Sequence, residues 1–144
     1  MFGFRRTADV QMRFRVEKPD AVWKRQLPPN AYQVLRHEGT ETPYTSPLNN
    51  EHRQGTFRCL GCNWPLFSSQ AKFDSGTGWP SFWTPINKQA VVQTTDNSLF
   101  ISRTEIKCAN CGGHLGHVFN DGPPPTGLRY CMNGVAMTFQ PGAA

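Results

Sequence analysis

Residues 56–67 read TFRCLGCNWPLF and place a Cys-x-x-Cys turn between two short apolar runs. Such runs on either side of a tight turn are typical of two adjacent strands. A second turn of the same kind, Cys108-Ala-Asn-Cys111, follows 45 residues later. Because each turn directs two sulfurs at one point, the two turns together supply the four thiolates that zinc prefers. We therefore expect one zinc ion bound by Cys59, Cys62, Cys108 and Cys111, pinning one hairpin to another.

The cysteine pairs have two competing interpretations, structural disulfides and a redox-active pair. Disulfides are disfavoured in the cytoplasm, where we expect this protein. A redox pair of the thioredoxin type needs one Cys-x-x-Cys at the start of a helix in a βαβ unit, which the sequence does not predict. Four thiolates also leave no position for water, so the expected zinc is structural and not catalytic. Gly61 and the Gly112-Gly113 pair fit the tight backbone of such turns.

The N-terminal part of the chain predicts two short helices. The first is expected at 21–27 with Asp20 as its N-terminal cap, and the second at 31–36 with Asn30 as its cap. Pro28 and Pro29 separate them, and Gly39 would end the second helix.

The rest of the chain predicts strands and turns. Thirteen glycines and twelve prolines favour short strands over long helices. Two strands are expected at 90–95 and 99–106, around a turn at Asp96-Asn97. A last strand is expected from 127 to 139, where a shift in the apolar pattern after Gly134 indicates a bulge. The fold class is therefore mainly β, with short N-terminal helices before an antiparallel domain.

The net charge of +5 lies mostly at the N-terminus. Residues 1–25 hold seven Lys or Arg and three acids, whereas the other 119 residues hold eight and seven. A nucleic-acid groove would need basic residues across the folded body, so no nucleic-acid partner is expected. We expect residues 1–18 to form a flexible basic arm and 19–144 to form a single domain.

Membrane and secretory classes are also disfavoured. No apolar stretch approaches the roughly twenty residues that span a bilayer. No apolar run follows the basic N-terminal residues, so a secretory signal is not expected. We therefore expect a cytoplasmic location.

Cys131 is the cysteine left over from the two turns. A lone cysteine is usually a small buried hydrophobe. Alternation along a strand, however, puts Cys131 on one face with Arg129 and Asn133, an unusual lining for a core. A neighbouring guanidinium favours the thiolate. The spacing alone leaves a buried and a reactive Cys131 equally open.

Two further clusters could face this thiol. His114 and His117 follow the second cysteine turn; they could be extra metal ligands or surface residues, but zinc has its four ligands, which leaves them for proton transfer. Residues 76–83 read GTGWPSFW, and three aromatic side chains in five residues often belong to a core. The glycines and the proline instead favour a loop, where exposed rings suit a methyl-bearing ligand.

These pieces together resemble the methionine-R-sulfoxide reductases of the MsrB type. The resemblance covers about residues 20–140 and rests on six segments in the same order: Cys59-x-x-Cys62, GWPSF at 78–82, Cys108-x-x-Cys111, HLGHVF at 114–119, DGP at 121–123 and TGLRYC-x-N at 126–133. It implies two antiparallel sheets in a β-tent-like domain with N-terminal helices and a structural zinc. It also implies stereospecific reduction of the R epimer of methionine sulfoxide in oxidised proteins and peptides, by a domain that we expect to be monomeric.

The resemblance also implies roles for individual residues. Cys131 would be the nucleophile, and Trp79 would hold the substrate methyl group. We expect the remaining site residues to be His117, His114, Asn133 and Arg129 around the thiol, and Phe82 and Phe119 beside the substrate. A sulfoxide accepts a thiol only if its oxygen is protonated, and His117 is the favoured acid, with His114 second.

The chain departs from many relatives at one position. They carry a second, resolving cysteine in Ser-Gly-Cys-Gly-Trp-Pro-Ser-Phe, where this chain has Thr77. No cysteine remains to resolve an oxidised Cys131, so we expect thioredoxin or a small thiol to do so.

Two other functions stay open at this point. A zinc-stabilised binding module would have no need of Cys131, His117 or Asn133. A hydrolase with a Cys-His pair would release an acyl product and need no reductant. Cys131→Ser would leave the binding module unharmed but would inactivate the reductase. The hydrolase differs from the reductase in its products.

Overall fold

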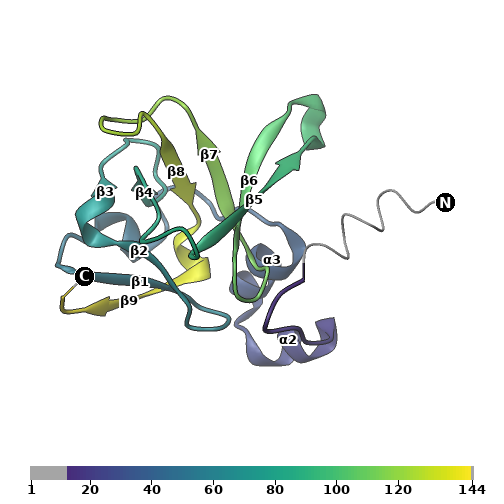
Figure 1. Ribbon diagram of the computed structural model, residues 1–144. Helices are drawn as coiled ribbons and strands as arrows, with labels where there is room; N and C mark the ends of the chain where they lie inside the picture. Colours follow the sequence, from purple (N-terminus) through teal and green to yellow (C-terminus); the bar gives the residue numbers. More distant parts are fainter. Residues whose placement is uncertain (1–12, 144) are drawn as a thin grey trace.

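The computed structural model describes residues 13–143, and this part of the chain forms two α-helices and nine strands in two sheets (Figure 1). The α-helices are α2 (Asp20–Gln26) and α3 (Pro29–His37), and short 3-10 helices lie at Pro47–Asn50, Ser69–Ala71, Ser98–Phe100 and Gly134–Ala136. The strands are β1 (Gly55–Cys59), β2 (Pro65–Ser68), β3 (Lys72–Phe73), β4 (Ser81–Phe82), β5 (Val91–Asp96), β6 (Arg103–Cys108), β7 (His114–Phe119), β8 (Arg129–Met132) and β9 (Met137–Pro141).

All strand pairs are antiparallel, which confirms the predicted fold class. The smaller sheet has the order β2-β1-β9, and the larger sheet has the order β3-β4-β8-β7-β6-β5. The β5–β6 pair forms the hairpin predicted around Asp96-Asn97 and extends away from the rest of the domain (Figure 1).

The single strand predicted for residues 127–139 is wrong. The chain forms β8 in the larger sheet, turns through the 3-10 helix Gly134–Ala136 and continues as β9 in the smaller sheet. The change in apolar pattern at Gly134 therefore marks a crossing between sheets, not a bulge. A Cβ at Gly134 would collide with the Ser46 side chain, so only glycine fits at the crossing.

Both helices were predicted, but their caps differ from the prediction. Pro19 and Pro28 are the N-caps, and neither has a side-chain cap bond. Asp20 is instead the first residue of α2, and its carboxylate accepts a hydrogen bond from the Tyr32 hydroxyl at 2.6 Å. Helix α3 ends at His37, and its C-cap, which adopts a left-handed conformation with φ of 57°, is Glu38 and not Gly39.

The core lies where the two sheets meet. Phe57 of β1, Phe67 of β2 and Phe82 of β4 are fully buried, and the rings of Phe67 and Phe82 stack with centroids 4.3 Å apart. The helices add Trp23 and Leu35, both almost fully buried. Burial of these large side chains stabilises the fold by roughly 1.5–3 kcal/mol each.

Part of the predicted arm contacts the domain. Within residues 13–18, the Val16 N–H donates to the Asn110 carbonyl at 3.0 Å, and the Phe14 ring lies over Gly112, where a Cβ would come within 2.6 Å of it. The first twelve residues of that arm lie outside the described residues.

Candidate active site and metal centre

The two cysteine turns have the same backbone form. In each, the N–H of the residue after the second cysteine donates to the carbonyl of the first: Asn63 to Cys59 at 2.7 Å, and Gly112 to Cys108 at 2.8 Å. Asn63 and Gly112 both have positive φ, 69° and 75°. Asparagine and glycine adopt this region most readily, so the sequence suits both turns.

Gly61 lacks the backbone conformation that would require a glycine. It has no positive φ, and a Cβ there would lie 3.4 Å from the Trp23 ring. That distance is an ordinary contact, whereas a Cβ at Gly113 would come within 2.7 Å of Leu35. Gly113 therefore lets α3 pack closely against its cysteine turn.

The four cysteine sulfurs meet between the two sheets and could hold a metal ion. All four lie within 4.8 Å of one another. Cys59 and Cys111 are 3.7 Å apart at their sulfurs, and Cys62 and Cys108 are 3.6 Å apart. A tetrahedron with Zn–S bonds of about 2.3 Å has edges of about 3.8 Å, so the residues fit zinc.

Arg36 of α3 lies against this cluster. Its guanidinium donates to the Cys111 carbonyl at 3.0 Å and lies 3.9 Å from the Cys111 sulfur. A fixed cation beside four thiolates offsets part of the negative charge that remains when a divalent ion binds them.

A single row of polar residues crosses five strands of the larger sheet. The register pairs Ser81 with Cys131, Cys131 with His117, His117 with Glu105, and Glu105 with Thr94. Directly opposite residues in antiparallel strands point to the same face of the sheet. Cys131 therefore has Ser81 on one side and His117 on the other.

Cys131 lies at a cavity of about 300 Å³. Its sulfur is 3.9 Å from the Thr77 hydroxyl oxygen, and the residue is half-buried. The cavity is lined by Thr40, Thr77, Trp79, Arg103, Gly116, His117, Phe119, Arg129, Cys131 and Asn133. All predicted site residues except His114, Phe82 and the metal ligands thus lie around one cavity.

The pKa of the Cys131 thiol is raised above its ordinary value. Burial is the main cause, and it outweighs the opposite effects of the Thr77 hydroxyl and the Arg129 guanidinium. The predicted influence of Arg129 is thus present with the predicted sign, but it does not decide the protonation state. Cys131 rests as a thiol near neutral pH.

Arg129 is held in place by Asp121 and Phe119. Its guanidinium donates to the Asp121 carboxylate at 2.9 and 3.1 Å and lies 4.5 Å from the centre of the Phe119 ring. The hydrogen bonds to Asp121 raise the pKa of Arg129 further, so its charge is permanent at the cavity wall.

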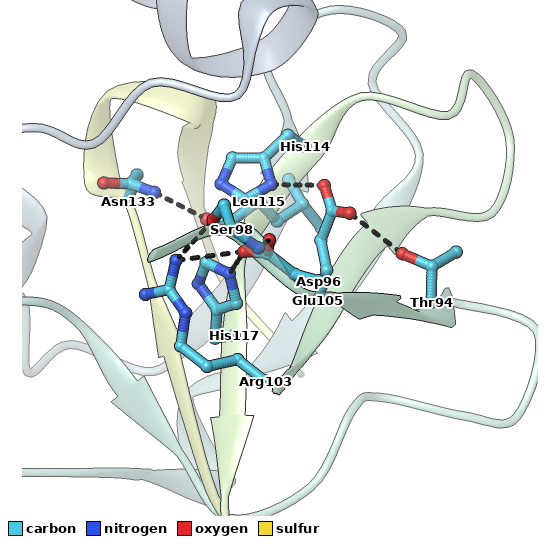
Figure 2. A network of polar contacts seen from close by, with 9 residues as sticks. All are labelled: Thr94, Asp96, Ser98, Arg103, Glu105, His114, Leu115, His117 and Asn133. Atoms are coloured by element: carbon cyan, nitrogen blue, oxygen red, sulfur yellow. Dashed lines mark hydrogen bonds and ion pairs between the residues drawn. The ribbon is translucent and has the colours of Figure 1, made fainter. Parts of the chain in front are cut away.

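His117 is fixed by a carboxylate of the β5–β6 hairpin (Figure 2). Its Nε2–H donates to Asp96 at 2.9 Å, and the same carboxylate oxygen accepts from Arg103 at 3.0 Å. Burial lowers the pKa of His117 below its ordinary value of 6.5, although Asp96 opposes this. With Nε2 bound to Asp96, Nδ1 is the nitrogen of His117 left for a ligand.

His114 is bound by a second carboxylate and is more deeply buried (Figure 2). Its Nδ1–H donates to Glu105 at 2.7 Å, and Glu105 also accepts from the Thr94 hydroxyl at 2.8 Å. Burial alone would raise the pKa of Glu105, but the hydrogen bonds from His114 and Thr94 lower it. The Nε2 atom of His114 is buried and has no hydrogen-bond partner among the described residues.

The charge of Asp96 can be tested through the titration of His117. Asp96→Asn keeps a hydrogen-bond acceptor but removes the charge that favours the imidazolium, so the midpoint of His117, already below 6.5, should fall further. The midpoint is read from the imidazole resonances by NMR as the pH is changed. Asp121→Asn removes a carboxylate that is bound to Arg129, and it should leave His117 unchanged. An unchanged or higher midpoint in Asp96→Asn would contradict the assigned pair.

Asn133 positions the backbone around the cavity. Its amide nitrogen donates to the Leu115 carbonyl at 3.0 Å, and its amide oxygen accepts from the Glu41 N–H at 2.9 Å. Trp79 is bound to the same loop, because its indole N–H donates to the Glu41 carbonyl at 3.0 Å. Asn133 is therefore placed to position its neighbours, with its polar atoms already engaged.

The two predicted substrate phenylalanines lie in different places. Phe119 lines the cavity beside Arg129. Phe82 is fully buried in the core, stacked on Phe67, and does not reach the cavity. It points to the face of β4 opposite Ser81, since successive residues of a strand alternate in direction.

Three acidic residues of the site were missed from the sequence. Asp96 and Glu105 hold the two histidines, and the Glu41 carboxylate accepts the backbone N–H groups of Gly134 and Val135 at 2.9 and 2.8 Å. Burial raises the pKa of Glu41, although these two hydrogen bonds act to lower it. For Glu105, the sequence offered one local signal, which is the position of this acidic residue inside a predicted, partly apolar strand.

Comparisons with known proteins identify the family of this chain. The SelR domain family matches residues 27–141. The peptide methionine sulfoxide reductase MsrB of Agrobacterium fabrum is 55% identical over 127 residues, which cover 88% of this chain and 94% of the relative. Proteins of the same name from Pseudomonas putida strain W619 and Leptospira interrogans are 53% and 50% identical, covering 88% and 90% of this chain and 96% and 98% of theirs. The chain therefore belongs to the MsrB family of SelR-domain proteins.

Proposed function

We propose that this protein reduces methionine-R-sulfoxide in peptides and proteins to methionine, with Cys131 as the nucleophile. Its membership of the MsrB family supports the activity. One observation supports the assignment of Cys131: it is opposite His117 in the β7–β8 pair, in a cavity that also contains Trp79.

The reaction joins the Cys131 sulfur to the sulfoxide sulfur. As that bond forms, the sulfoxide oxygen gains a proton. The hydroxyl group then moves to the Cys131 sulfur and the bond between the two sulfurs breaks, which leaves a sulfenic acid and releases methionine. The thiol and the sulfoxide thus become the sulfenic acid and the thioether, so the cysteine is oxidised by two electrons and the substrate reduced by two. Because Cys131 rests as a thiol, its proton passes first to the unprotonated Nδ1 of His117, and the imidazolium formed in this way delivers a proton to the sulfoxide oxygen.

His117 is the proton donor in this proposal, and His114 positions it. His117 lines the cavity and keeps Nδ1 for the substrate, whereas the free nitrogen of His114 is buried. The two rings lie edge to face with centroids 5.4 Å apart. The Arg129 cation stabilises negative charge that develops on sulfur or oxygen near Cys131.

The substrate methyl group lies against Trp79 and Phe119. Sulfur against an aromatic ring is favourable by up to about 1.5 kcal/mol. An apolar wall on one side of the sulfoxide and an acid on the other distinguish its two epimers, because only one epimer presents oxygen to His117 while its methyl meets the rings.

The four-cysteine cluster binds one zinc ion with a structural role. Zinc supplies charge neutralisation to four thiolates and joins β1 of the smaller sheet to β6 of the larger one through Cys59 and Cys108. It takes no part in the reaction, since Cys131 is not one of its four ligands.

An external thiol returns Cys131 to its reduced state, and we name thioredoxin or a small thiol as the reductant. After one turnover without reductant, we expect a sulfenic acid and the loss of one of the five thiols per chain. A sulfenic-acid trapping reagent added before denaturation, followed by a thiol count and mass measurement, checks this result.

Thr77→Cys is the matched control for that experiment. The Thr77 hydroxyl oxygen lies 3.9 Å from the Cys131 sulfur, so a sulfur at position 77 is within reach of the oxidised cysteine. This variant should lose two thiols and give an intramolecular disulfide. Loss of two thiols in the unmodified chain would contradict the need for an external reductant.

Oxidised proteins in the cytoplasm are the proposed substrates, and residues 19–144 form the proposed catalytic domain, acting as a monomer. No helix in the described part of the chain has the length and apolar character to cross a membrane.

The test of the proposed function is consumption of the two epimers in one peptide. The R epimer should be converted to methionine in the presence of a dithiol, and the S epimer should remain, both followed by chiral chromatography. Equal consumption of both epimers, or of neither, would refute the proposal.

A further inference from the structure

We infer that Glu41 is a positioning residue for the proposed reduction, because its carboxylate anchors a loop that holds the Trp79 ring at the Cys131 cavity. We call this loop, residues 40–46, the clamp loop. The inference rests on the proposed function, in which Trp79 holds the substrate methyl group.

The segment that carries Trp79 lies outside the regular secondary structure. Residues 76–79 form bends between β3 and β4, and Gly76 and Gly78 have positive φ, 74° and 93°. Glycine has more backbone freedom than any other residue, so the sequence of this segment does not stiffen it. The position of the Trp79 ring therefore depends on contacts with other parts of the chain.

The clamp loop supplies three hydrogen bonds to this segment. The indole N–H of Trp79 donates to the Glu41 carbonyl at 3.0 Å. The Tyr44 N–H donates to the Gly78 carbonyl at 2.8 Å, and the Tyr44 hydroxyl donates to the Gly76 carbonyl at 2.7 Å. The two segments also approach closely, since a Cβ at Gly78 would lie 2.8 Å from the Tyr44 ring. The position of Trp79 therefore follows that of the clamp loop.

The Glu41 carboxylate fixes the clamp loop to the rest of the domain. Its two oxygens accept the N–H groups of Gly134 and Val135 at 2.9 and 2.8 Å, in the 3-10 turn that joins β8 to β9. Hydrogen bonds to a charged acceptor are about twice as strong as those between neutral groups. Glu41 is half-buried, whereas residues 42–45 are exposed. The carboxylate is therefore the attachment that we expect to hold the loop most firmly.

The clamp loop borders two cavities. Thr40 lines the Cys131 cavity, and it also lines a second cavity of about 690 Å³ together with Glu41 and Ser46. The loop therefore has space into which it can shift when the carboxylate no longer holds it. Such a shift would move the Glu41 carbonyl, release the Trp79 indole N–H and displace the ring from the substrate methyl group.

Glu41→Gln tests the inference because it keeps the size of the side chain. The amide oxygen can accept one of the two N–H groups, but the amide nitrogen is itself a donor and cannot accept the other. The KM for a peptide with methionine-R-sulfoxide should rise about tenfold. The kcat at saturating dithiol should stay within about threefold of the wild type, because Cys131 and His117 lie on paired strands and Asn133 keeps its bond to Leu115.

Glu38→Gln is the matched control. It makes the same change of charge at an exposed side chain just before the clamp loop, and it should leave KM unchanged. The Trp79 indole N–H gives a second measurement, by NMR. Its resonance is the indole resonance missing from Trp79→Phe. In Glu41→Gln it should move upfield and exchange faster with water, as expected for a lost hydrogen bond.

The outcomes separate the two proposals. A wild-type KM in folded Glu41→Gln, or an unchanged Trp79 resonance, would overturn the inference but leave the reductase intact. If Glu41→Gln does not fold, Tyr44→Phe decides, since it removes only an exposed hydroxyl bound to Gly76. It should raise KM about twofold to threefold, and an unchanged KM would overturn the inference. Failure of the wild type to reduce the R epimer would overturn the proposed function, while the Trp79 resonance, which needs no turnover, would still decide whether Glu41 holds the ring.

Discussion

Replacing Cys131 with serine is expected to lower kcat for methionine-R-sulfoxide by about a thousandfold or more. A serine hydroxyl is a far weaker nucleophile toward sulfur than a thiol, and it cannot be oxidised to a sulfenic acid. Loss of the nucleophile removes the covalent step itself, so the remaining residues cannot compensate. The measurement is the rate of methionine release from an oxidised peptide under saturating dithiol.

The fold of Cys131→Ser should stay intact. Cys131 is half-buried and has only a long contact to Thr77, so a hydroxyl in its place leaves no large void. Its unfolding temperature should lie within a few degrees of the wild type, and its zinc content should be unchanged. Substantial turnover by a folded, zinc-containing variant would show that another group attacks the sulfoxide.

Removing the metal is expected to destabilise the protein by several kcal/mol. Structural zinc sites contribute about 10–16 kcal/mol of apparent binding free energy in small domains, much of which appears as folding free energy. Here the four sulfurs join the two sheets, which also pack against each other through the core around Phe57 and Phe67. Urea unfolding with and without a strong chelator, together with the metal content per chain, measures the effect.

Cys108→Ser tests the same site by substitution. It removes one ligand from β6 and should lower both the zinc content and the free energy of unfolding. The matched control is Cys131→Ser, which removes a cysteine outside the cluster and should keep one zinc per chain. A metal-free protein with wild-type stability would contradict a structural zinc.

The parts of the fold that the sequence predicted are those set by local patterns. The strand before Cys59 and the hairpin around Asp96-Asn97 follow from short apolar runs and turn residues, and the structure has both. The last strand failed because a change of sheet and a bulge produce the same shift in apolar pattern. Only the contact between Gly134 and Ser46, residues far apart in the sequence, distinguishes the two.

The residues of the candidate site also divide into those that local patterns predicted and those that depend on strand pairing. Spacing alone placed Arg129, Cys131 and Asn133 near one another, and the structure brings all three to one cavity. The pairing of Cys131 with His117 depends on the register between two strands, which no local pattern specifies. The carboxylates of Asp96 and Glu105 were missed for this reason, since their partners lie on another strand.

The protonation of Cys131 required the structure because it depends on burial. The spacing of Arg129 and Cys131 predicted the neighbouring guanidinium and the correct sign of its effect on the pKa. It could not give the depth of the sulfur in the sheet, which raises the pKa by more than Arg129 lowers it.

The polar row across the larger sheet makes the chain intolerant of small changes in length. Neighbouring strands are held about 4.8 Å apart by their backbone, so the spacing of Ser81, Cys131 and His117 is set by the ladder and not by flexible side chains. Deleting one residue near Leu128 would shift β8 by one step and point Tyr130 or Met132 at His117. Cys131 would then face the hydrocarbon interior, and a single codon lost there would silence the protein as completely as removal of the sulfur.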